Sequence, residues 1–291
     1  MRRMPYVDYA KIDAVNMSTL LELLLSPKHY RYRLHRPRKE TEAMRVGRAG
    51  HTAVLEPMQF MREYVLQPEE FPDSKGTMKP ASKKLKSCKG WHADQQAAGK
   101  TALSQDQYAK AERIQDAVRS HSVAGRILSD GQREISIEWA DEQTGIRCKG
   151  RIDWLQDMAL VDLKTTRHAS SYAFAKQAAN LNYHTRLAWY QHGICAVKNT
   201  REVWTMPVRI IAVQNEEPHD VVVYNVPEDA LEVGRRRFHG LMETLKECMD
   251  TDSWPGVGEG EIIDLQMPGW ALGAESGEGE KLTIGGQPLE V

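Results

Sequence analysis

The feature of the sequence that most constrains the fold is a run of three strand-like segments in the middle of the chain. Residues 133–139 (REISIEW) alternate between polar and apolar side chains, and two more apolar-rich segments follow at residues 146–155 (IRCKGRIDWL) and 159–164 (ALVDLK). Short polar turns separate the three segments, a pattern that predicts an antiparallel meander. The chain must therefore build much of its core on a β-sheet.

The second hairpin of this meander is predicted to oppose two aspartates. If Asp157 and Met158 are the turn residues, Asp153 lies directly opposite Asp162, and the Cβ atoms of directly opposed residues are about 4.5–5.5 Å apart. Alternation with a period of two puts Lys164 on the same face. The opposite face receives four apolar side chains suited to a core: Ile152, Trp154, Val161 and Leu163.

Two opposed aspartates are unfavourable in a sheet unless a cation binds between them. Mg²⁺ takes oxygen ligands, commonly one or two carboxylates with waters and substrate phosphates, and it orients and acidifies an attacking water. A nearby lysine can position the water or neutralise phosphate charge. A D-x-K pattern alone is usually a surface ion pair. Here the facing Asp153 and the apolar opposite face of the hairpin favour catalysis by Asp153, Asp162 and Lys164.

Helices are expected on both sides of the meander, and two further strands after it. The helical segments are residues 17–35 (N-cap Ser18, interrupted at Pro27), 41–55, 104–128 (N-cap Ser104), 171–196 and 228–249; the strands are residues 203–213 and 219–226. Residues 72–90 are expected to form a flexible loop. This order predicts one α/β domain at residues 1–270, followed by an acidic Gly/Glu-rich tail at residues 271–291.

Composition limits the classes of protein that remain. The net charge of −1 argues against a nonspecific nucleic-acid coat protein, although residues 28–48 and the lysines of residues 75–89 are locally basic. The lysine-rich loop could grip backbone phosphates or be a mobile, solvated loop. No apolar run is long enough to cross a membrane, and the N-terminus lacks an apolar signal core. Four scattered cysteines without CxxC spacing fit a reducing cytoplasm.

GRIDWL followed by LVDLKTT resembles the PD-(D/E)XK nuclease superfamily, with Asp153 as the first acid and Asp162-Leu163-Lys164 as the D-x-K element. The chain is most similar to the exonuclease VIII branch, which is found in phages and bacterial prophages. The segments that support this branch are GRAGHTAVLEP (47–57), REISIEWADEQTGIRCKGRID (133–153), YHTRLAWYQHG (183–193), SWPG (253–256) and MPGW (267–270).

The resemblance implies a PD-(D/E)XK, restriction-endonuclease-like α/β core with a central mixed sheet flanked by helices. It implies Mg²⁺-dependent hydrolysis of DNA, with Mn²⁺ as a second candidate metal. One strand of a linear duplex would be digested from its 5′ end, and the remaining 3′ single strand would pass to a single-strand annealing protein for homologous recombination. The resemblance further implies a ring-like homo-oligomer that binds double-stranded DNA ends in the bacterial cytoplasm, away from the membrane.

The resemblance also extends the candidate site. It makes His51 a metal ligand, although a histidine packed in a helix is the commoner case without it. Glu134, in the strand before Asp153, could add a carboxylate to the metal or could be exposed on an edge strand. The relatives' Gln-x-x-x-Tyr element is matched by Tyr190, but Arg186 replaces the glutamine on the same helical face. Tyr190, Arg186 and Arg48 are the candidate DNA-binding residues.

Two other functions remain open at this point. An endonuclease or a single-strand-specific nuclease could use the same core. A non-catalytic DNA-binding module could descend from a nuclease, but the presence of Asp153, Asp162 and Lys164 disfavours an inactive relative.

Overall fold

The computed structural model describes residues 1–36, 40–260, 262–267, 283–284 and 287–288. The chain divides into two compact units, Met1–Trp254 and Pro255–Val291. In the second unit, strands β12 (Thr283–Ile284) and β13 (Gln287–Pro288) pair in antiparallel fashion. Apart from these four residues, the acidic tail expected at 271–291 lies outside the described residues, as does most of the MPGW segment. The first unit holds every candidate site residue.

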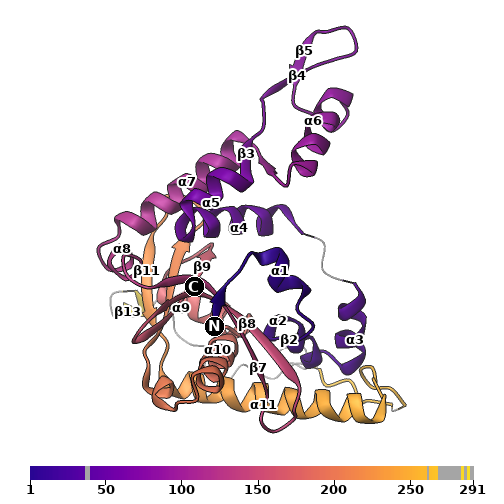
Figure 1. Ribbon diagram of the computed structural model, residues 1–291, viewed down its shortest axis with the longest axis vertical. Coiled ribbons are helices and arrows are strands. Elements are labelled where there is room, and N and C mark those ends of the chain that lie inside the picture. Colours follow the sequence, from indigo (N-terminus) through magenta and orange to yellow (C-terminus); the bar gives the residue numbers. More distant parts are fainter. Residues whose placement is uncertain (37–39, 261, 268–282, 285–286, 289–291) are drawn as a thin grey trace. The chain divides into compact units, whose positions relative to one another are not determined.

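A mixed sheet with the strand order β1-β7-β8-β9-β10-β11 forms the centre of the first unit (Figure 1). Strands β9 and β10 run parallel, the other neighbours in this order are antiparallel, and β2 pairs in parallel with β8. The bounds are β1 Arg2–Arg3, β2 Val15–Asn16, β7 Gln132–Ala140, β8 Arg147–Gln156, β9 Ala159–Thr166, β10 Val208–Gln214 and β11 Val221–Asn225. The predicted meander and the mixed α/β fold are confirmed.

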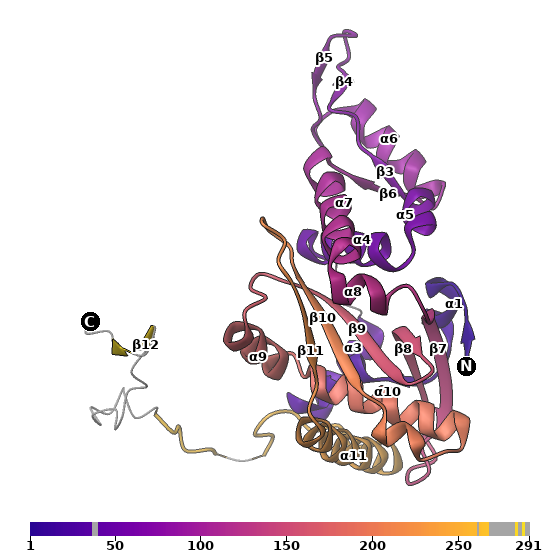
Figure 2. The same ribbon diagram turned by 90° about the vertical axis from the view of Figure 1, so that its left-hand side faces the viewer.

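Helices cover both faces of this sheet (Figure 2). On one face α10 (Tyr183–Lys198) contacts β7 and β8, and α11 (Glu228–Thr251) packs against α10. On the other face α4 (Glu42–Leu55), α7 (Gln105–Ser120) and α8 (Ser122–Ile127) contact β9, β10 and β11, respectively. Helix α9 (Ser171–Asn180) precedes α10. Each face therefore has its own apolar core, the larger one centred on Trp189 and Phe238.

Local sequence signals explain where several helices begin. The Thr41 side chain accepts a hydrogen bond from the Met44 amide and caps α4. Ser104 caps α7 in a full capping box with Gln107, as predicted. Among the described residues, no helix combines the length and the apolar character that crossing a membrane requires.

The helical segment predicted at residues 17–35 is interrupted at Pro27, as expected, but it is also divided before that residue. The segment forms α2 (Met17–Leu20), a 3-10 helix η1 (Leu21–Leu24) and α3 (Pro27–His35). Ser26 caps α3 and Pro27 occupies its first turn, so these residues begin a new helix. Asn16, not Ser18, caps α2.

Four other predicted segments differ from the structure. The helix expected at 104–128 divides at His121, and the one expected at 171–196 divides at Asn182, which adopts a left-handed conformation. Residues 202–205 form a 3-10 helix (η2, Glu202–Thr205) before β10 begins. The loop expected at 72–90 is largely ordered. The loop range overlaps β4 (Glu70–Pro72), β5 (Met78–Pro80) and α6 (Lys86–Ala97). The neighbouring elements are α5 (Pro57–Glu63) and β3 (Tyr64–Leu66) before it and β6 (Thr101–Leu103) after it. Helix α1 (Tyr6–Lys11) lies near the N-terminus.

Candidate metal centre

The hairpin of β8 and β9 has the predicted register. Trp154 pairs with Val161, and the two pairs closer to the turn follow in step. The pair of Trp154 with Val161 is the last regular one, so Asp153 and Asp162, the next residues away from the turn, are not paired. The Leu163 amide instead donates a hydrogen bond of 2.9 Å to Oδ2 of Asp153. The Asp153 carboxylate thus replaces a backbone acceptor where the two strands separate.

The predicted apolar face of this hairpin is correct for three of its four residues. Trp154, Val161 and Leu163 belong to the core that faces α4, α7 and α8, but Ile152 packs in the core on the other face of the sheet. The regular pairing of β7 with β8 skips Glu134 and Asp153, although the pairs on either side are present. Alternation is therefore interrupted at the position where the candidate ligands lie.

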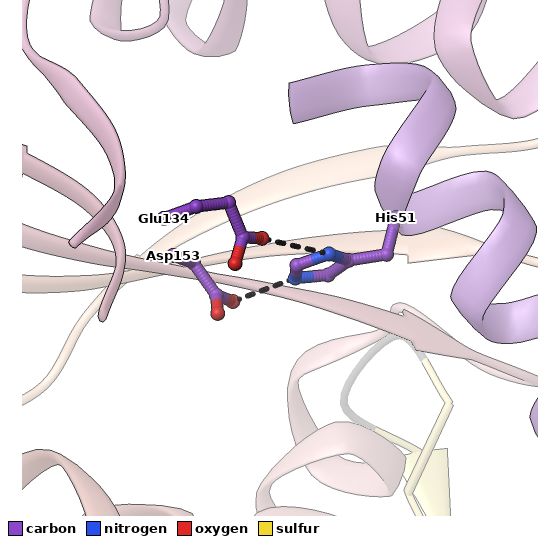
Figure 3. Close-up of side chains that lie close together, drawn as sticks. All are labelled: His51, Glu134 and Asp153. Carbon is purple, nitrogen blue, oxygen red and sulfur yellow. Dashed lines mark ion pairs between the residues drawn. The ribbon is translucent and has the colours of Figure 1, made fainter. Parts of the chain in front are cut away.

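Three side chains from three elements converge beside this interruption (Figure 3). His51 comes from α4, Glu134 from β7 and Asp153 from β8, and one potential ligand atom of each lies within 4.8 Å of the others. His51 Nε2 is 3.0 Å from Asp153 Oδ2, and His51 Nδ1 is 3.5 Å from Glu134 Oε1. The structure thus brings together three of the four predicted metal ligands.

The glycine one turn before His51 allows α4 to approach the sheet. A Cβ atom at Gly47 would lie 3.3 Å from the Thr165 hydroxyl on β9, closer than an ordinary van der Waals contact. A larger residue would therefore require a small shift of the Thr165 side chain or of α4.

Glu134 has an unusual backbone for a non-glycine residue in a strand. Its φ angle is 54°, in the left-handed region, where a strained residue costs about 1–3 kcal/mol. Its carboxylate is fixed by an ion pair with Arg151 and by the contact with His51. Arg151 in turn donates a hydrogen bond of 3.1 Å to the Met4 carbonyl. Sequence reasoning missed Arg151, although its place two residues before Asp153 on the same strand was a usable signal.

Asp162 lies outside the group of three ligands. Its side chain is buried, and the Lys164 ammonium forms an ion pair with it. Oδ2 of Asp162 has no hydrogen-bond partner of acceptable geometry in the described structure, although Lys164 is in contact with it. The Lys164 ammonium also lies 5.2 Å from the centre of the Tyr183 ring. The buried Asp162 carboxylate is therefore neutralised by Lys164 and not by the group of three ligands.

The charges of these residues are strongly interdependent. Burial lowers the pKa of His51, but Asp153 and Glu134 outweigh burial and raise it to about 9. Burial raises the pKa of Asp162 to about 6, with Lys164 opposing and Asp153 adding to the shift. Burial also acts to raise the pKa of Asp153, but His51 and Lys164 hold it below its usual value. The carboxylates thus keep a positive charge on the His51 ring between them.

The donor set fits a divalent cation. Carboxylate oxygens suit Mg²⁺ and Mn²⁺, whereas an imidazole nitrogen is better suited to the later transition metals. Asp153 and Glu134 raise the pKa of the His51 ring between them, which indicates that this position favours positive charge. His51, Glu134 and Asp153 are therefore the residues that could hold such an ion, and the Asp162–Lys164 ion pair is the fourth predicted ligand with its own cation.

The candidate DNA-binding residues lie in different surroundings. Arg48 lines the cleft beside His51 and forms a 2.5 Å ion pair with Glu40. Arg186 donates a hydrogen bond to the Ser18 hydroxyl on α2. The Tyr190 ring packs against Gly150 on β8. A Cβ atom at this glycine would lie only 3.1 Å from the ring, so the position favours glycine. Burial and the nearby Asp162 and Asp153 raise the pKa of Tyr190.

A cleft of about 650 Å³ opens at the three converging side chains. Its lining includes residues from three regions: the N-terminal residues 3–7, helices α4 and α5, and the short strands β3 and β6 through Tyr64 and Thr101. The N-terminal segment was not anticipated as part of the site.

Buried cations hold this N-terminal segment in place. Lys149 on β8 is 5% exposed, and its ammonium donates hydrogen bonds of 3.1, 3.3 and 2.7 Å to the carbonyls of Tyr9, Ala10 and Ile12. These carbonyls end α1 or follow it, where helical acceptors lack partners. Lys149 and Arg151 thus attach residues 4–12 to the strand that carries Asp153.

The fold and the acidic cluster beside Asp162 and Lys164 define a protein of the PD-(D/E)XK class. The chain belongs to the family described as a PDDEXK-like domain of unknown function (DUF3799), whose profile matches residues 16–266. The superfamily expected from the sequence is therefore confirmed.

Comparison with solved structures supports the same fold. A structure described as a "putative exonuclease" from Eubacterium rectale matches with a TM-score of 0.60 and 13% identity, covering 94% of this chain and 99% of that chain. At this identity the likeness shows the fold alone. A structure described as SSO0001 has 13% identity, covers 47% of this chain and 68% of that chain, and has a TM-score of 0.26, too low to carry an argument. A search of curated proteins found no match.

Proposed function

We propose that this protein is a metal-dependent deoxyribonuclease that digests linear double-stranded DNA from its ends. The observation that carries the proposal is the convergence of His51, Glu134 and Asp153 in a cleft beside Asp162 and Lys164. A PDDEXK-like domain with an intact set of acids and lysine is the arrangement expected of a nuclease rather than of an inactive DNA-binding relative.

Each residue has a distinct role in this proposal. Asp153, Asp162, Glu134 and His51 would hold the ion, Mg²⁺ or Mn²⁺, which would supply Lewis-acid stabilisation of charge on the scissile phosphate. The Leu163 amide fixes the orientation of Asp153. Lys164, held between Asp162 and the Tyr183 ring, presents its ammonium to the attacking water or a phosphate oxygen. Arg151 keeps the Glu134 carboxylate directed at the centre.

The proposal places the DNA end against the cleft wall. Arg48 and Arg186 would contact backbone phosphates, and Tyr190 would support the strand near Asp162. The pair of Arg48 with Glu40 and the contact of Arg186 with Ser18 leave further guanidinium donors for phosphate oxygens.

The finer biological role follows the exonuclease VIII-like resemblance. The proposed polarity is 5′ to 3′, which leaves a 3′ single strand for a single-strand annealing protein and homologous recombination in a phage or prophage context. A ring-like homo-oligomer would enclose the DNA, and the bacterial cytoplasm is the proposed compartment. These statements rest on the sequence segments given above.

One assay separates this proposal from its alternatives. Linear duplex labelled at the 5′ or 3′ end, closed circular duplex and single-stranded circles are incubated with Mg²⁺, with Mn²⁺ and with EDTA. The proposal predicts metal-dependent loss of linear duplex, early release of the 5′ label, and intact circles. Cleavage of circles would indicate an endonuclease or a single-strand-specific nuclease, and binding without cleavage in either metal would indicate a DNA-binding module.

A further inference from the structure

A basic projection, residues 67–100, extends from the body that carries the central sheet (Figure 1). It consists of the antiparallel pair β4–β5 and helix α6. Phe71 and Trp91 pack edge to face with ring centres 5.9 Å apart, and Phe71 and Cys88 are buried. The projection is therefore an ordered element with a small apolar core.

The surface of the projection carries a concentrated positive charge. Residues 74–93 contain six lysines and no acidic residue. All six lysines are exposed, and none forms an ion pair with an acid in the described part of the chain. The six are Lys75, Lys79, Lys83, Lys84, Lys86 and Lys89. Unpaired lysines this close together repel one another, so they would gain from an anionic partner.

The base of the projection adjoins the candidate metal centre. Tyr64 and Thr101 begin the paired strands β3 and β6 from which the projection extends, and both line the cleft that contains His51 and Asp153. Gly99, within the projection, lines the same cleft. A polymer that leaves the cleft past Tyr64, Gly99 and Thr101 would meet the projection at its base.

We propose that the basic projection is a second DNA-binding element, which grips the phosphate backbone of the duplex beyond the end held at the metal centre. This inference rests on the proposed function for its substrate class. The three features that carry it are the absence of paired acids, the exposure of all six ammonium groups and the shared wall with the cleft. Such contacts bind without regard to sequence, and their strength falls with salt.

The test is a salt series of binding to a linear duplex in EDTA, so that no cleavage occurs. The variant Lys79→Gln/Lys83→Gln/Lys84→Gln removes three charges without removing a recorded side-chain contact. Three lost phosphate contacts should lower the log–log salt slope by about 2.7. Between 50 and 200 mM salt, the wild type should therefore lose about 40-fold more affinity than the variant.

Two matched variants make the result specific to the projection. Lys198→Gln/Arg201→Gln/Arg236→Gln removes three exposed charges, at the end of α10, just before η2 and on α11, and should keep the wild-type slope. Lys79→Arg/Lys83→Arg/Lys84→Arg retains the charge and should also keep it. The inference is overturned if the glutamine variant in the projection keeps the wild-type slope, if both glutamine variants lower it equally, or if the wild type binds no duplex. A chain that binds in this way but never cleaves would refute the proposed function and leave the inference standing.

Discussion

His51 Nε2 lies 3.0 Å from Asp153 Oδ2 and joins helix α4 to strand β8 across the candidate metal centre. The second ring nitrogen of His51 faces Glu134, so one imidazole serves two carboxylates. Both ions prefer carboxylate oxygens, but Mn²⁺ is a transition-metal ion that accepts a nitrogen ligand more readily than the harder Mg²⁺, so the histidine should set the preference between them.

We therefore expect His51→Ala to weaken Mn²⁺ binding by about tenfold or more, about 1.4 kcal/mol, and to weaken Mg²⁺ binding less. Calorimetric titration of both ions into wild type and variant measures the ratio of the two affinities. Equal losses for Mn²⁺ and Mg²⁺ would show that His51 is not a nitrogen ligand.

The left-handed backbone of Glu134 should make glycine more stabilising than alanine at this position, the reverse of the usual order in a strand. Glycine tolerates a φ of 54° and alanine does not, so Glu134→Gly should be more stable than Glu134→Ala by about 1 kcal/mol. At Glu138, on the same strand without positive φ, the order should reverse, with the glycine variant less stable by about 0.5–1 kcal/mol. Urea unfolding of the four variants measures both differences. The same order at the two positions would mean that Glu134 is unstrained.

The sequence carried enough information for the centre of the fold. The turn after Gln156 and the alternation around it gave the register of the hairpin, and Gln156 does pair with Ala159. The break at Glu134 could not be predicted, because a left-handed glutamate has no local sequence signature and is held by Arg151 and His51 from other elements.

Other features depend on partners that a sequence does not display. Lys149 donates hydrogen bonds to backbone carbonyls of a segment far away in the sequence. The pattern of side chains in a sequence does not indicate such backbone acceptors. The many lysines and glycines of the projection led to the prediction of a flexible loop. The few apolar residues that form its core, Phe71 and Cys88 among them, gave no clear pattern. The interruption predicted at Pro27 is present, but Ser26-Pro27 also begins a new helix, which the single range 17–35 did not express.

Lys164 should matter for chemistry more than for metal binding. Lys164→Met removes the ammonium that neutralises Asp162, so hydrolysis should fall on the order of 10²-fold or more, while metal affinity should be unchanged or higher because the Asp162 carboxylate becomes free. Single-turnover cleavage and metal titration on the same sample separate the two quantities. A loss of metal affinity as large as that of Asp162→Asn would contradict the role given to Lys164.

Lys149 should control the N-terminal wall of the cleft. Lys149→Met leaves the three carbonyls of residues 9–12 without their charged donor, which should cost about 1–3 kcal/mol and speed amide exchange in residues 5–16. Hydrogen exchange read by mass spectrometry compares this peptide with one from α11, which should be unchanged. Unaltered protection of residues 5–16 would show that the segment is held by other contacts.

The most direct test of the account is DNA hydrolysis by Asp153→Asn beside Glu138→Gln. Both changes neutralise one carboxylate, on adjacent strands, but only Asp153 contacts His51. With saturating linear duplex and Mg²⁺ or Mn²⁺, the account predicts that the wild type and Glu138→Gln degrade DNA at similar rates, whereas Asp153→Asn is slower on the order of 10²-fold or more. A rate for Asp153→Asn close to that of the wild type would contradict the assignment of this cluster as the nuclease centre.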